Sequence, residues 1–185
     1  MKKEMRCAVF TGQRAVKLQR FPIPEVDDDK LLVKIEACGI CTWEQRVFTG
    51  SINTDYPLIG GHEVAGRIEA IGKDVHGDWE VGQRVITLPC RSCYFCKTHE
   101  EQSCQNFNTA QVLSGQPYPG TGGFSEYMMA VPYSVFPYTN VTPQEACICE
   151  PVSCVIHSVE TVNPQFGDAC VIIGAGIMGL LHTQL

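Results

Sequence analysis

The chain has 185 residues, of which 44% are hydrophobic and 18% charged, as in a water-soluble globular protein of one or two domains. Its 14 Lys and Arg residues against 20 Asp and Glu residues give a net charge of −6, which argues against nucleic-acid binding. Because no apolar run reaches the roughly 18 residues that span a membrane, and the N-terminal residues lack a signal-peptide core, we expect a cytoplasmic protein without a membrane partner.

Short runs with strand character alternate with glycine, proline and aspartate through the first half of the chain. These runs are LLVKIEAC at 31–38, HEVAGRIEAIG at 62–72, QRVITL at 83–88 and, further on, FSEYMMAVP at 124–132. Residues 45–50 lie between two of the runs and predict a short helical turn. The pattern as a whole predicts a mainly β domain over residues 1–150.

Three short segments of this region carry side chains that can bind zinc: Cys41 in CGICTWE, His62 and Glu63 in GGHE, and Glu150 in CEP. Each is ambiguous alone, because a lone cysteine is usually a small buried hydrophobe and a lone histidine is usually hydrogen-bonded in the core or at the surface. All lie beside a glycine or a proline, where the end of a strand can present a side chain to a cleft. One thiolate, one imidazole and two carboxylates suit a catalytic zinc with an exchangeable position.

The charge of such a zinc site limits how many carboxylates bind at once. Zn²⁺ with the Cys41 thiolate, neutral His62 and one carboxylate is neutral, so it can still act as a Lewis acid on a bound water or alcohol. A second carboxylate makes the site anionic and weakens this acidity. We therefore expect either Glu63 or Glu150 to give way to substrate or water.

Four of the eleven cysteines lie close together in PCRSCYFCKTHEEQSC, at Cys90, Cys93, Cys96 and Cys104. Four thiolates can surround zinc at distances of about 2.3 Å and leave no open position, so the spacing predicts a structural zinc in a loop lobe at about residues 89–106. Disulfides, chance clustering and an iron–sulfur cluster are the alternatives. Disulfides fit poorly because the chain has no secretory signal.

A helical pattern follows the β region. Thr142 before Pro143, with Glu145 three residues after Thr142, predicts a helix that starts with a capping box. A second helix is predicted at about 152–162. These helices connect the β domain to a second unit, which we place at residues 151–185.

The segment GAGIMG predicts a dinucleotide-binding turn, because an apolar run that reads as a strand, Ala169–Ile173, precedes it and an apolar helix follows it. Gly174 permits the tight turn, Gly176 the approach of a pyrophosphate, and Gly179 close contact between helix and strand. We expect the first βα unit of a Rossmann domain that is incomplete in this chain. The choices between nicotinamide and flavin, and between NAD and NADP, stay open.

These three signals, in this order, resemble the zinc-dependent medium-chain dehydrogenase/reductase family of alcohol, sorbitol and threonine dehydrogenases. The resemblance runs along the whole chain, through CGIC, GGHEVAGRI, the four-cysteine segment, TGGFSEYMMAV and GDACVIIGAGIMG. It implies a GroES-like β-barrel catalytic domain joined to a Rossmann domain. It also implies catalytic and structural Zn²⁺, NAD or NADP as cofactor, and hydride transfer from a small-molecule alcohol or polyol. Family members often form homo-oligomers, so the resemblance allows one here.

The family's motifs imply roles for individual residues around the catalytic zinc. Cys41 and His62 occupy the positions of zinc ligands, and Glu63 that of a carboxylate that binds zinc in some members and only supports the ligands in others. Glu44 occupies the position of an acid that hydrogen-bonds the zinc histidine and sets its tautomer.

Two further positions bear on substrate and cofactor. Glu150 stands where typical alcohol dehydrogenases have cysteine and where sorbitol and threonine dehydrogenases have glutamate, which favours a secondary alcohol of a polyol, sugar or amino alcohol. Cys154 occupies a position that the resemblance places against the nicotinamide, although a small residue in a helix is equally well explained by packing.

The sequence departs from the family two residues after Cys41. Relatives usually have a serine or threonine there, whose hydroxyl passes the substrate proton outward, whereas this chain has Trp43, whose N–H can only donate. Arg46 stands where a relay histidine sometimes occurs. Thr42, Glu44 or a water must then relay the proton, or the substrates differ from simple alcohols. Trp43 itself is either a wall of the pocket or part of the core.

Two other interpretations remain beside the dehydrogenase. In the first interpretation, the 185-residue chain by itself is a non-catalytic zinc-binding fragment, because one βα unit offers no ribose or adenine site. In the second it is a zinc-free, quinone-reductase-like family member, which the two intact metal motifs disfavour.

Overall fold

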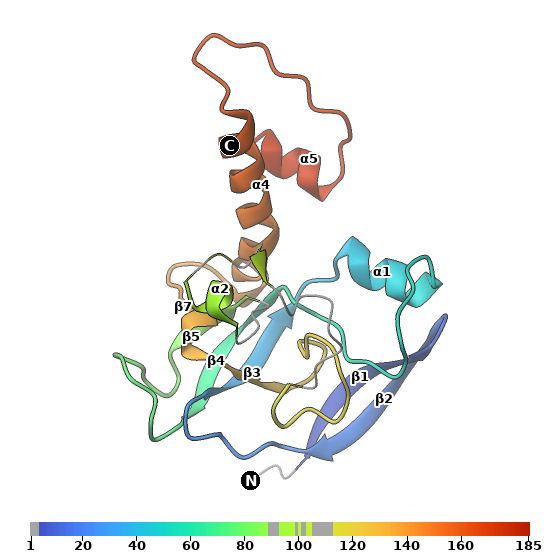
Figure 1. Cartoon of the computed structure of the whole chain (residues 1–185), viewed down its shortest axis with the longest axis vertical. Coiled ribbons are helices and arrows are strands. Elements are labelled where there is room, and N and C mark those ends of the chain that lie inside the picture. The colour runs from blue at the N-terminus through green and yellow to red at the C-terminus, as the bar shows by residue number, and fades with distance from the viewer. Residues whose placement is uncertain (1–3, 89–92, 99, 101–102, 105–112) are drawn as a thin grey trace.

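The computed structural model describes residues 4–88, 93–98, 100, 103–104 and 113–185, and every structural statement below concerns these residues (Figure 1). Valine and isoleucine recur in the central strands, as their β propensity predicts. The strands are β1 (Glu4–Gly12), β2 (Ala15–Pro22), β3 (Leu31–Cys38), β4 (Val64–Ile71), β5 (Arg84–Thr87), β6 (Tyr127–Ala130) and β7 (Val135–Pro137).

Five of the strands form one antiparallel sheet in the order β6-β3-β4-β5-β7, and β1 and β2 form a separate antiparallel hairpin. The central pair β3–β4 runs from Leu31 opposite Ile71 to Cys38 opposite Val64, with two register shifts between. The C-terminal end of β3 therefore lies beside the N-terminal end of β4. Residues that follow Cys38 and residues that precede Val64 therefore meet at this end of the two strands.

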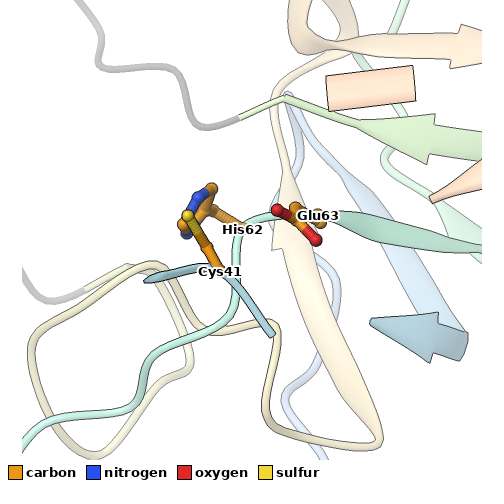
Figure 2. Close-up of side chains that lie close together, drawn as sticks. All are labelled: Cys41, His62 and Glu63. Atoms are coloured by element: carbon orange, nitrogen blue, oxygen red, sulfur yellow. The ribbon is translucent and has the colours of Figure 1, made fainter. Parts of the chain in front are cut away.

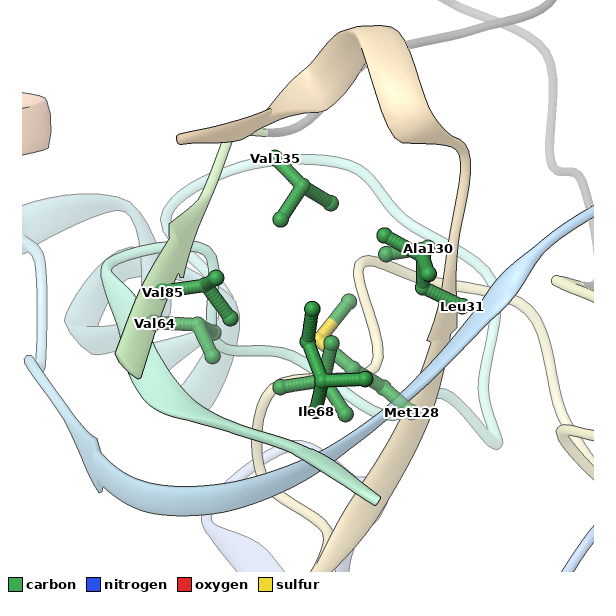
Figure 3. Packing of buried hydrophobic residues seen from close by; sticks show 8 residues of the cluster. Leu31, Val64, Ile68, Val85, Met128, Ala130 and Val135 are labelled. Carbon is green, nitrogen blue, oxygen red and sulfur yellow. The ribbon is translucent and has the colours of Figure 1, made fainter. Parts of the chain in front are cut away.

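Alternate side chains of β3 and β6 supply two cores, as the two-residue period of a strand requires. Leu31 and Val33 point into one cluster, which is completed by Val64, Ile68, Val85, Met128, Ala130 and Val135 (Figure 3). Leu32 points to the opposite face and packs with Met5, Cys7, Val9, Ile59, Tyr127 and Met129, which attaches the hairpin to the sheet. Each fully buried aliphatic side chain stabilises the fold by about 1.5–3 kcal/mol.

The helices are α1 (Thr42–Thr49), α2 (Tyr94–Lys97), the 3₁₀ turn η2 (Pro132–Ser134), α3 (Pro143–Ala146), α4 (Cys149–Val162) and α5 (Ile177–His182). Figure 1 shows α4 projecting away from the β-rich body, with α5 packed along its far end. No helix in the described ranges combines the length and the apolar character that a membrane crossing needs.

Most elements predicted in the β region are present. β3 has the predicted bounds, and β4, β5 and β6 lie inside the other three runs. The helix predicted at 45–50 is real but starts earlier, at Thr42. The capping box of α3 is confirmed, because the Thr142 hydroxyl accepts a hydrogen bond from the Glu145 N–H at 3.3 Å and the Glu145 carboxylate accepts one from the Thr142 N–H at 2.7 Å.

The strand predicted over Ala169–Ile173 is wrong. These residues have no regular secondary structure, and Val171 and Ile173 are 86% and 95% exposed. A β-strand is stable only beside another strand, and the described part of the chain places none next to this run. The run is apolar, as a buried strand would be, but no described strand pairs with it.

The glycine turn after this run nevertheless has the predicted geometry. Gly174 has φ +111°, a conformation that favours glycine, and Gly176 is the N-cap of α5. A Cβ atom on Gly179 would lie 1.8 Å from the Gly174 carbonyl oxygen, so the helix can approach the turn only through glycine. A Cβ on Gly176 would meet only open space, as expected where a pyrophosphate approaches.

Candidate metal centre

Cys41, His62 and Glu63 meet where β3 ends and β4 begins (Figure 2). Cys41 follows β3 by three residues and is the N-cap of α1, while His62 and Glu63 immediately precede β4. One ligand atom from each lies within 4.8 Å of the others. The sheet register thus brings together residues that are about 20 positions apart in the chain.

Gly39 makes room for the third member of this group. Its N–H donates to the Glu63 carbonyl oxygen at 2.9 Å, and a Cβ on Gly39 would lie 1.7 Å from the Glu63 carboxylate atom Oε2. Any side chain at position 39 would therefore displace the carboxylate. Sequence reasoning missed this role, and the only signal for it was a glycine close to Cys41.

Glu44 connects the three parts of the site. The side chain is only 2% exposed, and its Oε2 accepts a hydrogen bond from the Cys41 N–H at 3.1 Å. Its Oε1 accepts from the Gly61 N–H and lies 2.9 Å from His62 Nδ1. Because a carboxylate only accepts, His62 carries its proton on Nδ1 and leaves Nε2 free for a metal ion.

The protonation of this pair follows from competing effects. Burial by itself disfavours both charged forms, but the hydrogen bond and the attraction between the two groups outweigh it. They lower the pKa of Glu44 and raise the pKa of His62. The carboxylate therefore stays ionised and accepts the His62 Nδ1–H, and a metal ion on Nε2 would replace the second ring proton of the imidazolium.

The other acidic groups around the site have raised pKa values, in contrast to Glu44. Burial raises the pKa of Cys41, of Glu63 and of Glu150, and nearby carboxylates raise the pKa of Glu63 further. A cation bound among these partly buried groups would favour their ionised forms. A thiolate, an imidazole nitrogen and a carboxylate are also the donor set that zinc prefers, so these residues fit a zinc ion.

Glu150 lies at the start of α4, half-buried, and the group that meets within 4.8 Å does not include it. It is still close enough for its charge to raise the pKa values of His62 and Glu63. Of the two carboxylates expected to compete for the metal, Glu63 is thus the one with an oxygen within 4.8 Å of the Cys41 and His62 ligand atoms.

The remaining predicted residues lie around this centre. Trp43 is 37% exposed, and its ring stands edge-to-face against His62 with centroids 6.3 Å apart, so it is not part of the core. Thr42 is exposed at the start of α1. Cys154 is exposed on α4, and burial of its sulfur followed by the charge of Glu150 raises its pKa.

The four-cysteine segment is described only in part. Cys90 lies outside the described residues, and so does the side chain of Cys96. Cys93 and Cys104 have their sulfur atoms 3.9 Å apart. Two sulfur ligands of a tetrahedral zinc lie about 3.8 Å apart at Zn–S distances of about 2.3 Å. This pair therefore suits the predicted structural zinc, which stays a prediction.

Comparison with known proteins gives relatives along the full length of the chain. D-arabinitol dehydrogenase 1 from Uromyces fabae is 33% identical over 185 residues, covering 98% of this chain and 51% of that protein. Sorbitol dehydrogenase from Bombyx mori is 32% identical over 190 residues, covering 96% of this chain and 52% of that protein. The chain thus spans about half the length of the curated relatives it matches.

A solved structure shares the fold. A protein from Sinorhizobium meliloti 1021, assigned as a zinc-binding dehydrogenase and bound to NADP, superposes with a TM-score of 0.82 at 28% identity, covering 99% of this chain and 53% of that one. Residues 27–140 also match the family described as the alcohol dehydrogenase GroES-like domain. The mainly β fold class and the resemblance to zinc-dependent medium-chain dehydrogenases are confirmed by these matches. With most of its β-rich body matched in this way, the chain belongs to the alcohol dehydrogenase GroES-like domain family.

Proposed function

We propose that this protein is a zinc-dependent, NAD(P)-linked dehydrogenase that oxidises a secondary alcohol of a polyol, sugar or amino alcohol. The observation that carries the proposal is the meeting of Cys41, His62 and Glu63 within 4.8 Å, with His62 Nε2 left free by Glu44. The polyol dehydrogenases among its relatives support the substrate class.

The proposed reaction divides the work between the cofactors and the chain. A zinc ion would supply Lewis acidity that favours loss of the alcohol proton, and the nicotinamide would accept the hydride. Cys41, His62 and Glu63 hold the metal, and Glu44 keeps the His62 ring in position. Glu150 stands beside the site without entering the ligand group.

The alcohol proton must also leave the site. Both oxygens of Glu44 already accept hydrogen bonds, from Cys41, Gly61 and His62, which leaves it poorly placed as a relay. Thr42 is exposed and has a hydroxyl that can both accept and donate. In this proposal Thr42 or a water therefore relays the proton, accepting it from the alcohol while passing a proton on to solvent.

The cofactor site follows from the glycine turn. The positive φ of Gly174, the open space beside Gly176 and the close approach of Gly179 to Gly174 support a pyrophosphate site before α5. Cys154 on α4 lines the nicotinamide side in this arrangement. Residues 1–150 then form the catalytic domain, and residues 151–185 form the connecting helix and the start of the cofactor domain.

The experiment that tests the proposal combines metal content with turnover. Purified protein is expected to contain two zinc ions per chain and to reduce NAD or NADP with D-arabinitol or D-sorbitol. Cys41→Ser should lower the zinc content to one and abolish activity. A protein without zinc would instead support the quinone-reductase-like interpretation, and full activity in Cys41→Ser would contradict the ligand assignment.

A second function applies to the 185-residue chain taken by itself. The apolar run Ala169–Ile173 is exposed and has no strand beside it, so the glycine turn stands without the sheet that supports a cofactor cleft. In this proposal the chain binds zinc but does not turn over substrate. Polyol-dependent reduction of NAD or NADP by the 185-residue chain would refute it.

A further inference from the structure

The indole of Trp43 is a large aromatic group without a place in the core. None of the four hydrophobic clusters formed by the described residues includes it, although its neighbour on α1, Val47, is fully buried in one of them. Trp43 is 37% exposed, so most of the side chain is covered and part of its apolar face stays accessible.

This face lies at the metal centre. Trp43 and His62 are in edge-to-face contact, with centroids 6.3 Å apart and planes at 80°. His62 Nδ1 lies 2.9 Å from Glu44 Oε1, which leaves Nε2 as the ring nitrogen that a metal ion would use. A molecule that reaches a metal ion on His62 must therefore pass close to the indole.

We infer that Trp43 is a specificity-determining residue whose ring packs against the carbon chain of a polyol substrate. The inference rests on the proposed dehydrogenase function and adds the group that selects the substrate. The C–H bonds of hydroxyl-bearing carbons carry partial positive charge, which the negative face of an indole attracts. The indole N–H can also donate to a substrate hydroxyl, whereas a small apolar alcohol offers little for either contact.

Trp43 has no part in moving the substrate proton. An indole has no acceptor for a proton, so position 43 makes a binding contact only and does not take part in the proton relay. Replacing the ring should therefore change the affinity for a polyol while leaving the metal site itself unchanged.

The test uses the 185-residue chain with Co²⁺ in place of zinc, because cobalt absorbs visible light and its band responds to its ligands. D-arabinitol is titrated while the cobalt band and the tryptophan emission are recorded. In the wild type both signals should change with the same midpoint. In Trp43→Ser the dissociation constant from the cobalt band should rise about three- to tenfold, as expected from the loss of one aromatic contact.

Three controls define the comparison. Trp43→Phe keeps a ring and should bind D-arabinitol within about threefold of the wild type. Trp79→Phe removes the only other tryptophan, which packs against the main core, and should leave both the affinity and the emission change in place. 2-Propanol, which has a short carbon chain and one hydroxyl, should lose less affinity in Trp43→Ser than D-arabinitol does.

The outcomes separate this inference from the proposed function. A cobalt band that responds to D-arabinitol with unchanged affinity in Trp43→Ser overturns the role of Trp43 and leaves the dehydrogenase proposal intact. So does an emission change that persists in Trp43→Phe. If D-arabinitol changes neither the cobalt band nor the emission of the wild type, the polyol does not reach the metal, and the proposed function itself is contradicted.

Discussion

At the scale of single residues, the site depends on groups that do not themselves touch the metal position. Glu44 accepts hydrogen bonds from Cys41, Gly61 and His62 and so joins the start of α1 to the segment before β4. One buried carboxylate thereby sets both the position of the thiol-bearing residue and the orientation of the imidazole. Gly39 acts in a different way, by leaving space that the Glu63 carboxylate occupies.

Replacing Glu44 should weaken metal binding without removing a ligand. In Glu44→Gln the His62 ring loses its charged partner, so zinc affinity should fall about 10- to 100-fold. Competition with a chelator measures this affinity. Glu36→Gln is a matched control, because Glu36 pairs with Arg67 and is not one of the residues that meet at the metal centre. Equal affinities in the two variants would contradict the positioning role of Glu44.

Adding one methyl group at position 39 should test whether Glu63 contributes to the metal site. The Cβ of Gly39→Ala would lie 1.7 Å from Glu63 Oε2, the end of a flexible side chain, so the carboxylate should move while the fold is kept. We expect a thermal midpoint close to that of the wild type and a zinc affinity reduced to that of Glu63→Gln. Wild-type affinity in Gly39→Ala would show that Glu63 is not a ligand.

At the scale of secondary-structure elements, the turn before β3 stabilises the central strand pair. The carbonyl oxygen of Asp27 accepts a hydrogen bond from the Lys30 N–H at 3.2 Å, and the Asp27 carboxylate forms an ion pair with the Lys30 side chain. Gly72, directly after β4, lies so close that a Cβ there would be 2.2 Å from the Asp27 carbonyl oxygen. The turn thus closes the end of the sheet opposite the metal centre.

This turn makes a contribution to stability that depends on pH. The hydrogen bond from Lys30 lowers the pKa of Asp27, so the contribution is fully present above the unfolded-state pKa of about 3.9 and is lost as the pH falls through the lower folded value. Below about pH 4, the free energy of unfolding of Asp27→Asn should therefore fall less steeply with decreasing pH than that of the wild type. The effect should be about 0.5 kcal/mol, because the ion pair is partly exposed.

Denaturant unfolding between pH 2 and 6 measures this difference. Asp29→Asn is the matched control, because it removes the same charge from the more exposed side of the same lysine. If the free energy of unfolding depends on pH in the same way in the two variants, the Asp27 ion pair does not stabilise the turn.

At the scale of the whole molecule, two parts of the chain differ in how well they are packed. The β-rich body has two continuous cores on the faces of β3 and β6. Residues 166–177 instead expose apolar side chains, including Phe166, Val171 and Ile173. Figure 1 shows this segment as a long loop at the far end of α4.

Hydrogen exchange should reveal this difference directly. Amides of residues 169–173 have no strand partner among the described residues, so they should exchange much faster than amides in β3 and β4. Mass spectrometry of peptides from the two regions makes the comparison within one sample. Protection of 169–173 equal to that of β3 would show that this run is paired, and would restore the strand predicted there.

Prediction from sequence succeeded where local signals decide the structure. β3 could be bounded because its apolar residues lie between turn residues, and α3 because Thr142 and Glu145 form a capping box with neighbouring backbone groups. The strand over 169–173 failed because a strand needs a neighbour that local sequence does not specify. Trp43 remained undecided between wall and core for the same reason, since only its contact with His62 places it at the site.

By itself, the sequence determined the chemistry available to this protein. A thiol, an imidazole and carboxylates beside tight turns, four clustered cysteines and a GxGxxG turn indicated zinc and a dinucleotide before any fold was known. Only the tertiary structure decided which carboxylate joins Cys41 and His62, because the β3–β4 register brings Glu63 to them while Glu150 arrives separately on α4. Local sequence determines which side chains and turns are present, whereas strand pairing determines the distances between residues that are remote in the sequence.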